Sequence, residues 1–242
     1  MVASRRQARA RVHILGKPQN SSAPDGSVTT KQVADVSLPQ SELDRIWNPE
    51  YLERLARTYW RFLTRVSLGL IRVVYGPDSR EVVLITRPFR LLTFHAPEYD
   101  ASTTHGRVTW RIKEGLLVAP HGRGKGYLRI DVERLEDWSD GPGGLQTARV
   151  SSEVGNFYPM IGGWGWFAKI GQFIYRITQL AIHAIVTDAF FRSLARLDLA
   201  PSVVGALRQQ AEEARMDGNP EEARRADAVA DVEEQRREAA TG

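Results

Sequence analysis

The chain of 242 residues has no cysteine. This absence excludes disulfide bonds, thiolate ligands for a metal and cysteine nucleophiles, and it makes a reducing cytoplasm the expected compartment. The first residues are charged and no apolar segment follows them, so we expect no secretory signal.

The chain also lacks a long uninterrupted hydrophobic run. Its most apolar stretch, residues 164–191, is interrupted by Lys169, Arg176, His183 and Asp188. Charges near the centre of a membrane-spanning helix are costly, so we expect no transmembrane helix. The same stretch is still compatible with an amphipathic helix that lies on a membrane surface.

Recognisable catalytic motifs are missing as well. The five histidines show no metal-ligand spacing such as HExxH, and no serine lies in a GxSxG motif. The segment 121–126 (HGRGKG) lacks the spacing of a phosphate-binding loop and is typical of a basic hairpin tip. The aromatic and basic residues form no RNA-recognition motif. We therefore assign no catalytic residue and expect no metal, no cofactor and no nucleic-acid partner.

What the sequence does contain is a regular alternation of apolar and polar residues in three successive segments. A period of two places one set of side chains on a buried face of a sheet and the other set in water. The intervening residues carry charges of both signs, which predicts cross-strand ion pairs on the wet face. The apolar positions are Val108, Trp110 and Ile112, then Leu128, Ile130 and Val132, then Ala148, Val150, Ser152 and Val154.

The remaining elements complete an α+β fold. Asn48 is a good N-cap and Pro49 suits the first helical position, so a helix should begin there. The apolar segment 164–197 predicts a long helix that covers the dry face of the sheet. We expect a loop at 98–104 and further strands at 32–38, 70–75, 81–86 and 91–95. The predicted architecture is a curved antiparallel sheet of about seven strands around a long C-terminal helix, followed by a helical hairpin.

Composition divides the chain into three parts. Residues 1–31 are basic and polar without periodicity, which predicts a disordered arm. Residues 32–200 form the expected domain. Residues 201–242 are acidic on balance and predict two helices separated by a break at 217–220. These helices are expected to be solvated, with intrahelical ion pairs, or to bind a protein partner.

Several segments resemble the START-like (SRPBCC) superfamily. Residues 33–39 (VADVSLP) and the helical segment 41–47 resemble its opening strand and helix. The segment 108–132 resembles its tryptophan-bearing hairpin, and 172–197 resembles its closing helix. The resemblance covers residues 32–198 and implies a helix-grip fold with a deep pocket between sheet and helix. Members of this superfamily bind lipids, sterols, polyketides or plant hormones; some cyclise polyketides, and others serve as carriers or interaction modules.

The candidate ligand-binding residues come from the inward face of the sheet and from the long helix. Several of them have a purely structural alternative: the polar residues of the helix would face solvent, Trp110 would belong to the core, and Ser152 and Asn156 would cap the end of the sheet. The candidates are Trp110, Ile130, Val150, Ser152, Val154 and Asn156 from the sheet, and Ile174, Arg176, Ile177, Gln179 and His183 from the helix.

These observations favour non-catalytic binding of an apolar or amphipathic small molecule, similar to a lipid or polyketide, in a cavity between sheet and helix. A cyclase or dehydratase is the alternative, and it would need a histidine or an acid inside that cavity. A third reading is an adaptor without a ligand. Exposed Trp164, Trp166 and Phe167 would instead indicate contact with a membrane surface.

Overall fold

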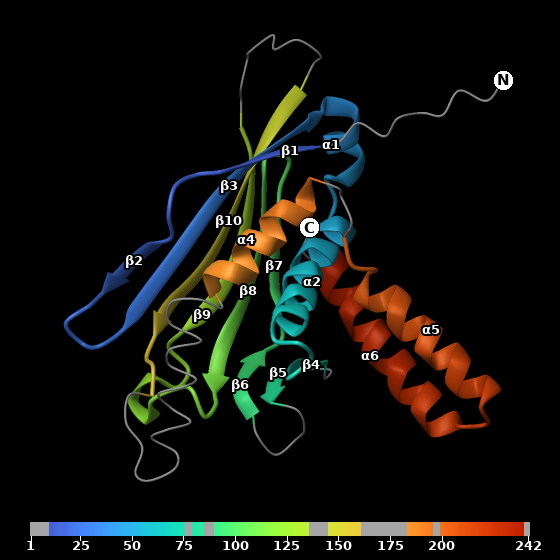
Figure 1. Cartoon of the computed structure of the whole chain (residues 1–242). Coiled ribbons are helices and arrows are strands. Elements are labelled where there is room, and N and C mark those ends of the chain that lie inside the picture. The colour runs from blue at the N-terminus through green and yellow to red at the C-terminus, as the bar shows by residue number, and fades with distance from the viewer. Residues whose placement is uncertain are drawn as a thin grey trace, which may run out of the picture.

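The computed structural model describes residues 10–75, 79–84, 90–135, 145–160, 183–195 and 199–239. The described chain has an α+β fold with ten strands, all paired antiparallel, and five α-helices (Figure 1). The strands are β1 (Arg11–Ile14), β2 (Gln19–Ser22), β3 (Val28–Pro39), β4 (Ile71–Tyr75), β5 (Ser79–Leu84), β6 (Arg90–His95), β7 (Glu98–Ala101), β8 (His105–Glu114), β9 (Tyr127–Arg134) and β10 (Leu145–Phe157). The helices are α1 (Gln40–Ile46), α2 (Pro49–Val66), α4 (His183–Leu194), α5 (Val203–Met216) and α6 (Pro220–Ala239), and a short 3-10 turn, η1, spans Pro120–Gly122.

The strands form one curved sheet in the order β1-β3-β10-β9-β8-β6-β5-β4. β2 continues along β3 beyond β1, and β7 pairs with β8. The first long strand and the last strand are thus neighbours, and β3 and β10 share the longest register of the sheet, from Leu145 opposite Pro39 to Phe157 opposite Val28. This strand order, with two helices after β3, is compatible with a helix-grip arrangement.

The sheet has more strands than the seven predicted. Two of the additional strands, β1 and β2, lie in the segment that was expected to be a disordered arm, and β7 lies where a loop was expected. The residues of β2 are all exposed and polar, so their own pattern contains no strand signal. These strands form because β3 is twelve residues long and β8 is ten, and each offers free backbone groups along an edge for a short partner.

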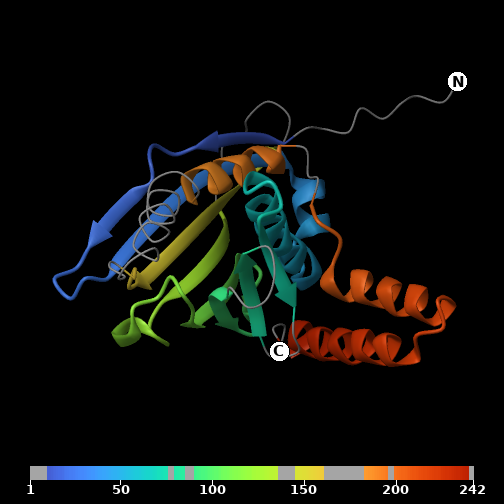
Figure 2. The ribbon, with the colours of Figure 1, turned by 60° about the horizontal axis from the view of Figure 1, so that its bottom comes forward.

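Helix α2 lies across the concave face of the sheet (Figure 2). It begins as predicted: the Asn48 side chain accepts a hydrogen bond from the Tyr51 amide at 3.0 Å, and Pro49 occupies the first helical position. Its buried side is centred on Leu52, Leu55, Tyr59 and Trp60. Of these, Leu55, Tyr59 and Trp60 belong to one continuous core with the inward residues of β8, β9 and β10.

The described part of the predicted helix 164–197 is α4, which ends at Leu194. Val186, Phe190, Phe191 and Leu194 are buried, and the ring of Phe190 meets the edge of the Tyr59 ring at 5.7 Å between centroids. The helix packs beside α2 and over β1 and β3 (Figure 2). No helix in the described ranges is both long and apolar enough to span a bilayer.

The outer face of the sheet is covered by cross-strand ion pairs, as the alternation predicted. Each pair joins a cation and a carboxylate on adjacent strands. They are Lys31–Glu153 at 3.8 Å, Arg149–Asp35 at 2.8 Å, Arg107–Asp131 at 2.5 Å and Arg111–Glu98 at 2.7 Å.

The last two helices, α5 and α6, form an antiparallel hairpin that projects beside α2 (Figure 1). Small side chains allow close approach of the two helices, and their seam is made of Ala211, Ala214, Ala223 and Ala226. The hairpin is also anchored to the domain. Arg80 of β5 and Glu233 of α6 form an ion pair at 2.6 Å in which both side chains are only 2% exposed.

Candidate functional site

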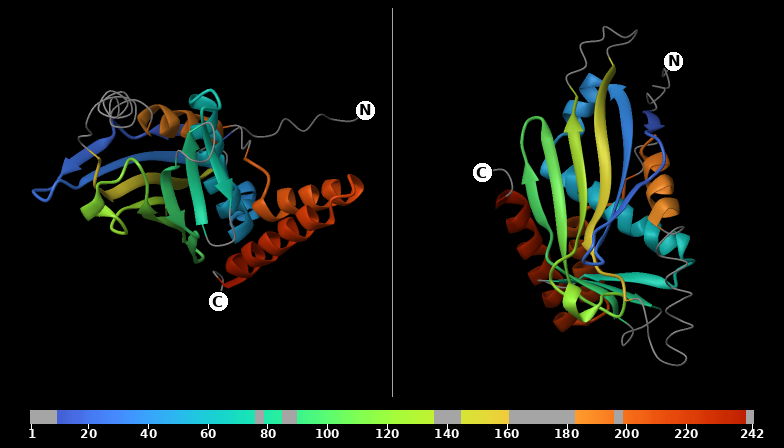
Figure 3. Two further views of the ribbon diagram at one scale, coloured as in Figure 1. Left: turned by 90° about the horizontal axis from the view of Figure 1, so that it is seen from below. Right: turned by 90° about the vertical axis from the view of Figure 1, so that its left-hand side faces the viewer.

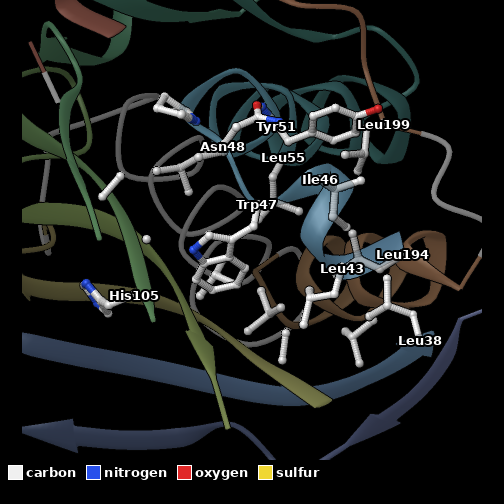
Figure 4. Close-up of a pocket in the computed structure, with 18 of the residues that line it drawn as sticks. Leu38, Leu43, Ile46, Trp47, Asn48, Tyr51, Leu55, His105, Leu194 and Leu199 are labelled. Atoms are coloured by element: carbon white, nitrogen blue, oxygen red, sulfur yellow. The ribbon is translucent and has the colours of Figure 1, made fainter. Parts of the chain in front are cut away.

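A cavity of about 390 Å³ lies between helices α1 and α2 and the concave face of the sheet (Figure 4). This volume is within the range of small-molecule sites. Most of its lining is aliphatic or aromatic. The lining residues are Val36, Leu38, Leu43, Ile46, Trp47, Asn48, Pro49, Tyr51, Leu52, Leu55, Ala101, Ser102, Thr103, His105, Gly106, Val132, Ala148, Val150, Leu194 and Leu199.

The cavity forms because the chain changes direction between α1 and α2. Trp47 and Asn48 separate the two helices, so α1 follows the end of β3 while α2 crosses the sheet. Below the helices, Ala148 and Gly106 present little or no side chain to the interior. The nearest atoms to a Cβ built on Gly106 would be the Leu52 methyl carbons, at 3.5 and 3.6 Å. Small residues on the sheet opposite a helix break therefore leave the space unfilled.

Trp47, at the edge of this cavity, is held by a hydrogen bond and by a cation stacked on its ring. Its indole Nε1 donates a hydrogen bond to the Ser102 carbonyl at 2.9 Å, which connects the helix break to the turn between β7 and β8. The Arg134 guanidinium lies over the indole, 4.8 Å from the ring centroid, and forms an ion pair with Asp44 at 2.9 Å. Stacking and hydrogen bonding together fix the ring in one orientation.

The polar groups around the cavity are mainly committed to the protein itself. Asn48 caps α2, and the Tyr51 hydroxyl accepts a hydrogen bond from Arg45 at 3.0 Å. The His105 ring contacts Asp131 at 3.3 Å, on the outer face where Arg107 also meets that carboxylate, and it stands apart from the leucines in Figure 4. No carboxylate occurs among the described lining residues. The interior is therefore suited to an apolar body, with polar groups only near the rim.

The structure distributes the candidate residues of the sheet among different environments. Val150 lines the cavity. Trp110 and Ile130 are buried in the core away from it, and the Trp110 ring packs against the edge of Trp60 at 5.2 Å. Val154 is partly buried against the same core. The prediction that Asn156 continues the inward register is wrong, because the pairing of β10 with β3 is irregular after Val154 and Asn156 is exposed, with φ of +53°.

The candidates on the predicted long helix fall mainly outside the described residues. These are Ile174, Arg176, Ile177 and Gln179. His183 begins α4, but its side chain is also outside the described part. The aromatic residues considered for membrane contact, Trp164, Trp166 and Phe167, are outside it as well.

Ser152 belongs to a cluster of polar side chains inside the core. It lies directly opposite Gln32 on β3, and both are at most 5% exposed. Burial raises the pKa of Tyr59, and the nearby hydroxyls of Thr187 and Ser152 act in the opposite direction. Yet Ser152 Oγ, Thr187 Oγ1 and Gln32 Oε1 reach no partner with good hydrogen-bond geometry among the described residues. Four elements, β3, β10, α2 and α4, thus bring polar groups together inside the core.

Sequence reasoning missed the residues of α1 and of the helix break. Leu43, Ile46 and Trp47 line the cavity, although the segment was interpreted only as part of the family's opening helix. The available signal was the tryptophan directly before the Asn48–Pro49 helix start, because a large aromatic residue at a break between two helices must find a surface to cover.

A second hollow, of about 460 Å³, lies between α5, α6 and Tyr75. It is bordered chiefly by Gln210, Asn219, Glu221, Glu222 and Arg225, and it is open to solvent along the hairpin. Such a polar groove has little apolar surface for a ligand to cover, so the first cavity is the better candidate site.

Comparisons with known proteins do not assign a family. No protein-family model matches the chain, and no curated protein sequence is significantly similar to it. The functional argument therefore depends on the cavity itself.

Proposed function

We propose that this protein binds an apolar or amphipathic small molecule, similar in size and polarity to a medium-length lipid chain or a polyketide, in the cavity beneath α1 and α2. The carrying observation is a 390 Å³ space whose inner wall is formed by leucine, valine and alanine side chains. Empty apolar space of this size weakens packing, so a protein that retains it gains stability when a ligand fills it.

The side chains that line the cavity favour binding over catalysis. General acid–base chemistry needs a titratable group within reach of the substrate. The described lining contains one imidazole, that of His105, and this ring is occupied with Asp131 on the outer face. The cyclase or dehydratase alternative therefore receives less support than a binding site without chemistry.

Two experiments test the proposal. Native mass spectrometry of the purified chain looks for a bound small molecule. A displacement assay then measures how well saturated acids and alcohols of increasing length compete with a fluorescent fatty acid. We expect saturable binding with an optimum chain length, because the cavity has a fixed volume. Absence of binding by every probe, together with unchanged thermal stability, would refute it.

A cavity-filling substitution makes the test specific. Ala148→Leu places three additional carbon atoms where the ligand would lie, and we expect it to weaken binding at least tenfold while the chain stays folded, since the cavity accepts the added volume. Ala239→Leu makes the same change at an exposed position of α6 and should bind like the wild type. If Ala148→Leu is unstable, Val132→Phe fills the cavity from the neighbouring strand β9.

A further inference from the structure

One end of the molecule exposes large apolar side chains that nothing in the described chain covers. It is formed by the turn between α2 and β4, the connection from β8 through η1 to β9, and the residues just after β10, all at the end of the sheet that is lower in Figure 1. The left panel of Figure 3 looks at this end and shows the α2–β4 turn on one side of it and the β8–β9 connection on the other. Four apolar residues stand out there: Leu68, 90% exposed, Leu70, 50%, Leu116, 49%, and Met160, 36%.

Backbone hydrogen bonds hold part of this surface together. The Leu116 amide donates to the Arg90 carbonyl at 3.1 Å, and the Met160 amide donates to the Leu117 carbonyl at 2.9 Å. The Gly124 amide donates to the Lys113 carbonyl at 3.0 Å. The start of β6, the end of β8 and the segment after β10 therefore meet at this end.

Leu68 shows that the exposure is built into the backbone. It is a non-glycine residue with φ of +53°, directly before Gly69 with φ of +80°. Branched side chains rarely adopt this left-handed conformation, and here it directs a leucine into solvent after the end of α2. A solvated turn with no other role would be better served by glycine or asparagine.

Cations lie in the same turns and connections as these apolar residues. Five of them are exposed and form no ion pair in the described part of the chain: Arg65, Arg72, Lys113, Arg123 and Lys125. Arg90 is also exposed and lies 3.6 Å from Glu81. The exposed carboxylates nearby are Glu114 and Asp25, and Asp25 is bound by the Tyr158 hydroxyl. On the outer face of the sheet, by contrast, each cation of the four cross-strand ion pairs has a carboxylate partner.

We propose that this basic end face, made of Leu68, Leu70, Leu116 and Met160 together with the five cations that form no ion pair in the described chain, docks on the surface of an anionic lipid membrane. Apolar side chains of this kind enter the boundary between headgroups and acyl chains, and arginine and lysine are attracted to anionic headgroups. Exposed apolar patches rimmed by polar residues mark sites of interaction with proteins or membranes. This inference does not depend on the proposed ligand, because the cavity lies toward the other end of the sheet.

Co-sedimentation with vesicles tests this surface. Vesicles of phosphatidylcholine alone are compared with vesicles that also contain phosphatidylserine. We expect the chain to sediment with the mixed vesicles, to bind the neutral ones far more weakly, and to dissociate as salt is added. Failure to bind the anionic vesicles, or equal binding to both kinds, would overturn the proposal.

Matched variants locate the contact. The double variant Arg123→Ser, Lys125→Ser should lower partitioning about 25-fold, since each cation near the surface contributes about fivefold. Leu68→Gly should also lower partitioning, and because it relieves the left-handed leucine it should leave the fold at least as stable. Met216→Ser and Arg224→Ser make similar changes on the exposed hairpin and should bind like the wild type.

If the hairpin variants lose binding as much as the end-face variants do, the surface is assigned wrongly. If the wild type ignores vesicles but binds an acidic protein through the same residues, the membrane assignment is wrong and the partner is a protein.

Discussion

At the scale of single residues, Asp25 shows how one carboxylate holds a turn. One oxygen accepts the Tyr158 hydroxyl at 2.6 Å and the other accepts the Ser27 amide at 3.0 Å. The first of these bonds is the main cause that lowers the pKa of Asp25 from 3.8 to about 2. The β2–β3 turn is thereby fastened to the segment that follows β10, although the two are far apart in the sequence.

The same bond predicts a dependence of stability on pH. A carboxyl whose pKa is lower in the folded chain contributes its stabilisation above the unfolded pKa near 3.8, and loses it as the pH falls toward 2. Between these values the wild type should therefore lose more thermal stability than Asp25→Asn, and the two curves should converge at the acid end. Asp100→Asn, at an exposed carboxyl without a bond in the described chain, is the control and should track the wild type.

At the scale of elements, the terminal hairpin is more firmly attached than its composition suggests. The Arg57 guanidinium donates to the Pro201 and Ser202 carbonyls, both at 2.8 Å, and the Glu53 carboxylate accepts the Val203 amide at 2.5 Å. Together with the buried pair of Arg80 and Glu233, these bonds connect α2 and β5 to the start of α5 and the last turns of α6. The hairpin therefore supports the back of the helix whose front lines the cavity.

Breaking the buried pair should be costly. Glu233→Ala leaves the Arg80 guanidinium buried without this carboxylate, which we expect to lower the free energy of unfolding by about 3 kcal/mol. Glu221→Ala removes a carboxylate from an i,i+4 pair that is about four-fifths exposed, and it should cost roughly 0.5 kcal/mol or less. Urea denaturation of both variants measures the difference, and equal effects would show that the buried pair is not what anchors α6.

At the scale of the whole molecule, the sheet and the helices meet through an apolar core with a polar centre. The hydroxyls of Ser152 and Thr187 are fully buried beside Tyr59, where the sheet faces α2 and α4. Buried polar groups without good partners lower stability unless they serve a ligand or an internal water. The polar centre is therefore the part of the core where an internal water or a polar ligand group would gain hydrogen bonds.

This arrangement gives a third prediction. The double variant Ser152→Ala, Thr187→Val removes both hydroxyls with little change in volume, so the free chain should unfold at an equal or higher urea concentration. A loss of about 2 kcal/mol or more would mean that these hydroxyls make strong internal hydrogen bonds. The single variants should be measured beside the double variant, because the effects of neighbouring substitutions on the free energy of unfolding are not additive.

The sequence predicted the elements that depend on residues close together in the chain, and it missed those that depend on distant contacts. The Asn48 cap, the three alternating strands and the two tail helices depend on neighbours within a few residues, and the structure confirms them. Strand β2 depends on the edge of β3, and nothing in its own four exposed residues marks it. The position of Asn156 depends on an irregularity in pairing, which no alternation of residues reveals.

The sequence predicted a cavity on the concave face of the sheet, but beneath the long C-terminal helix. The cavity found lies beneath α1 and α2 instead. Val150 was chosen because its register faces inward, and it does line the space. Trp110 and Ile130 share that register and lie in solid core instead. What separates them is the position of α2 above each strand and the break at Trp47, and those are set by the packing of whole helices.

The pairing of β3 with β10 has a consequence for how the chain is made. This pair, which has the longest register in the sheet, joins residues near 34 to residues near 150, so it cannot form until about two thirds of the 242 residues have been synthesised. Until then β3 has only β1, β2 and the following helices as partners, and its inward face of Ala34, Val36 and Leu38 has no sheet to join. Sheets closed by such distant contacts form slowly, and their early strands are exposed to aggregation during synthesis. During that interval β1 and β2 can cover one edge of β3, while the opposite edge, which later pairs with β10, stays open.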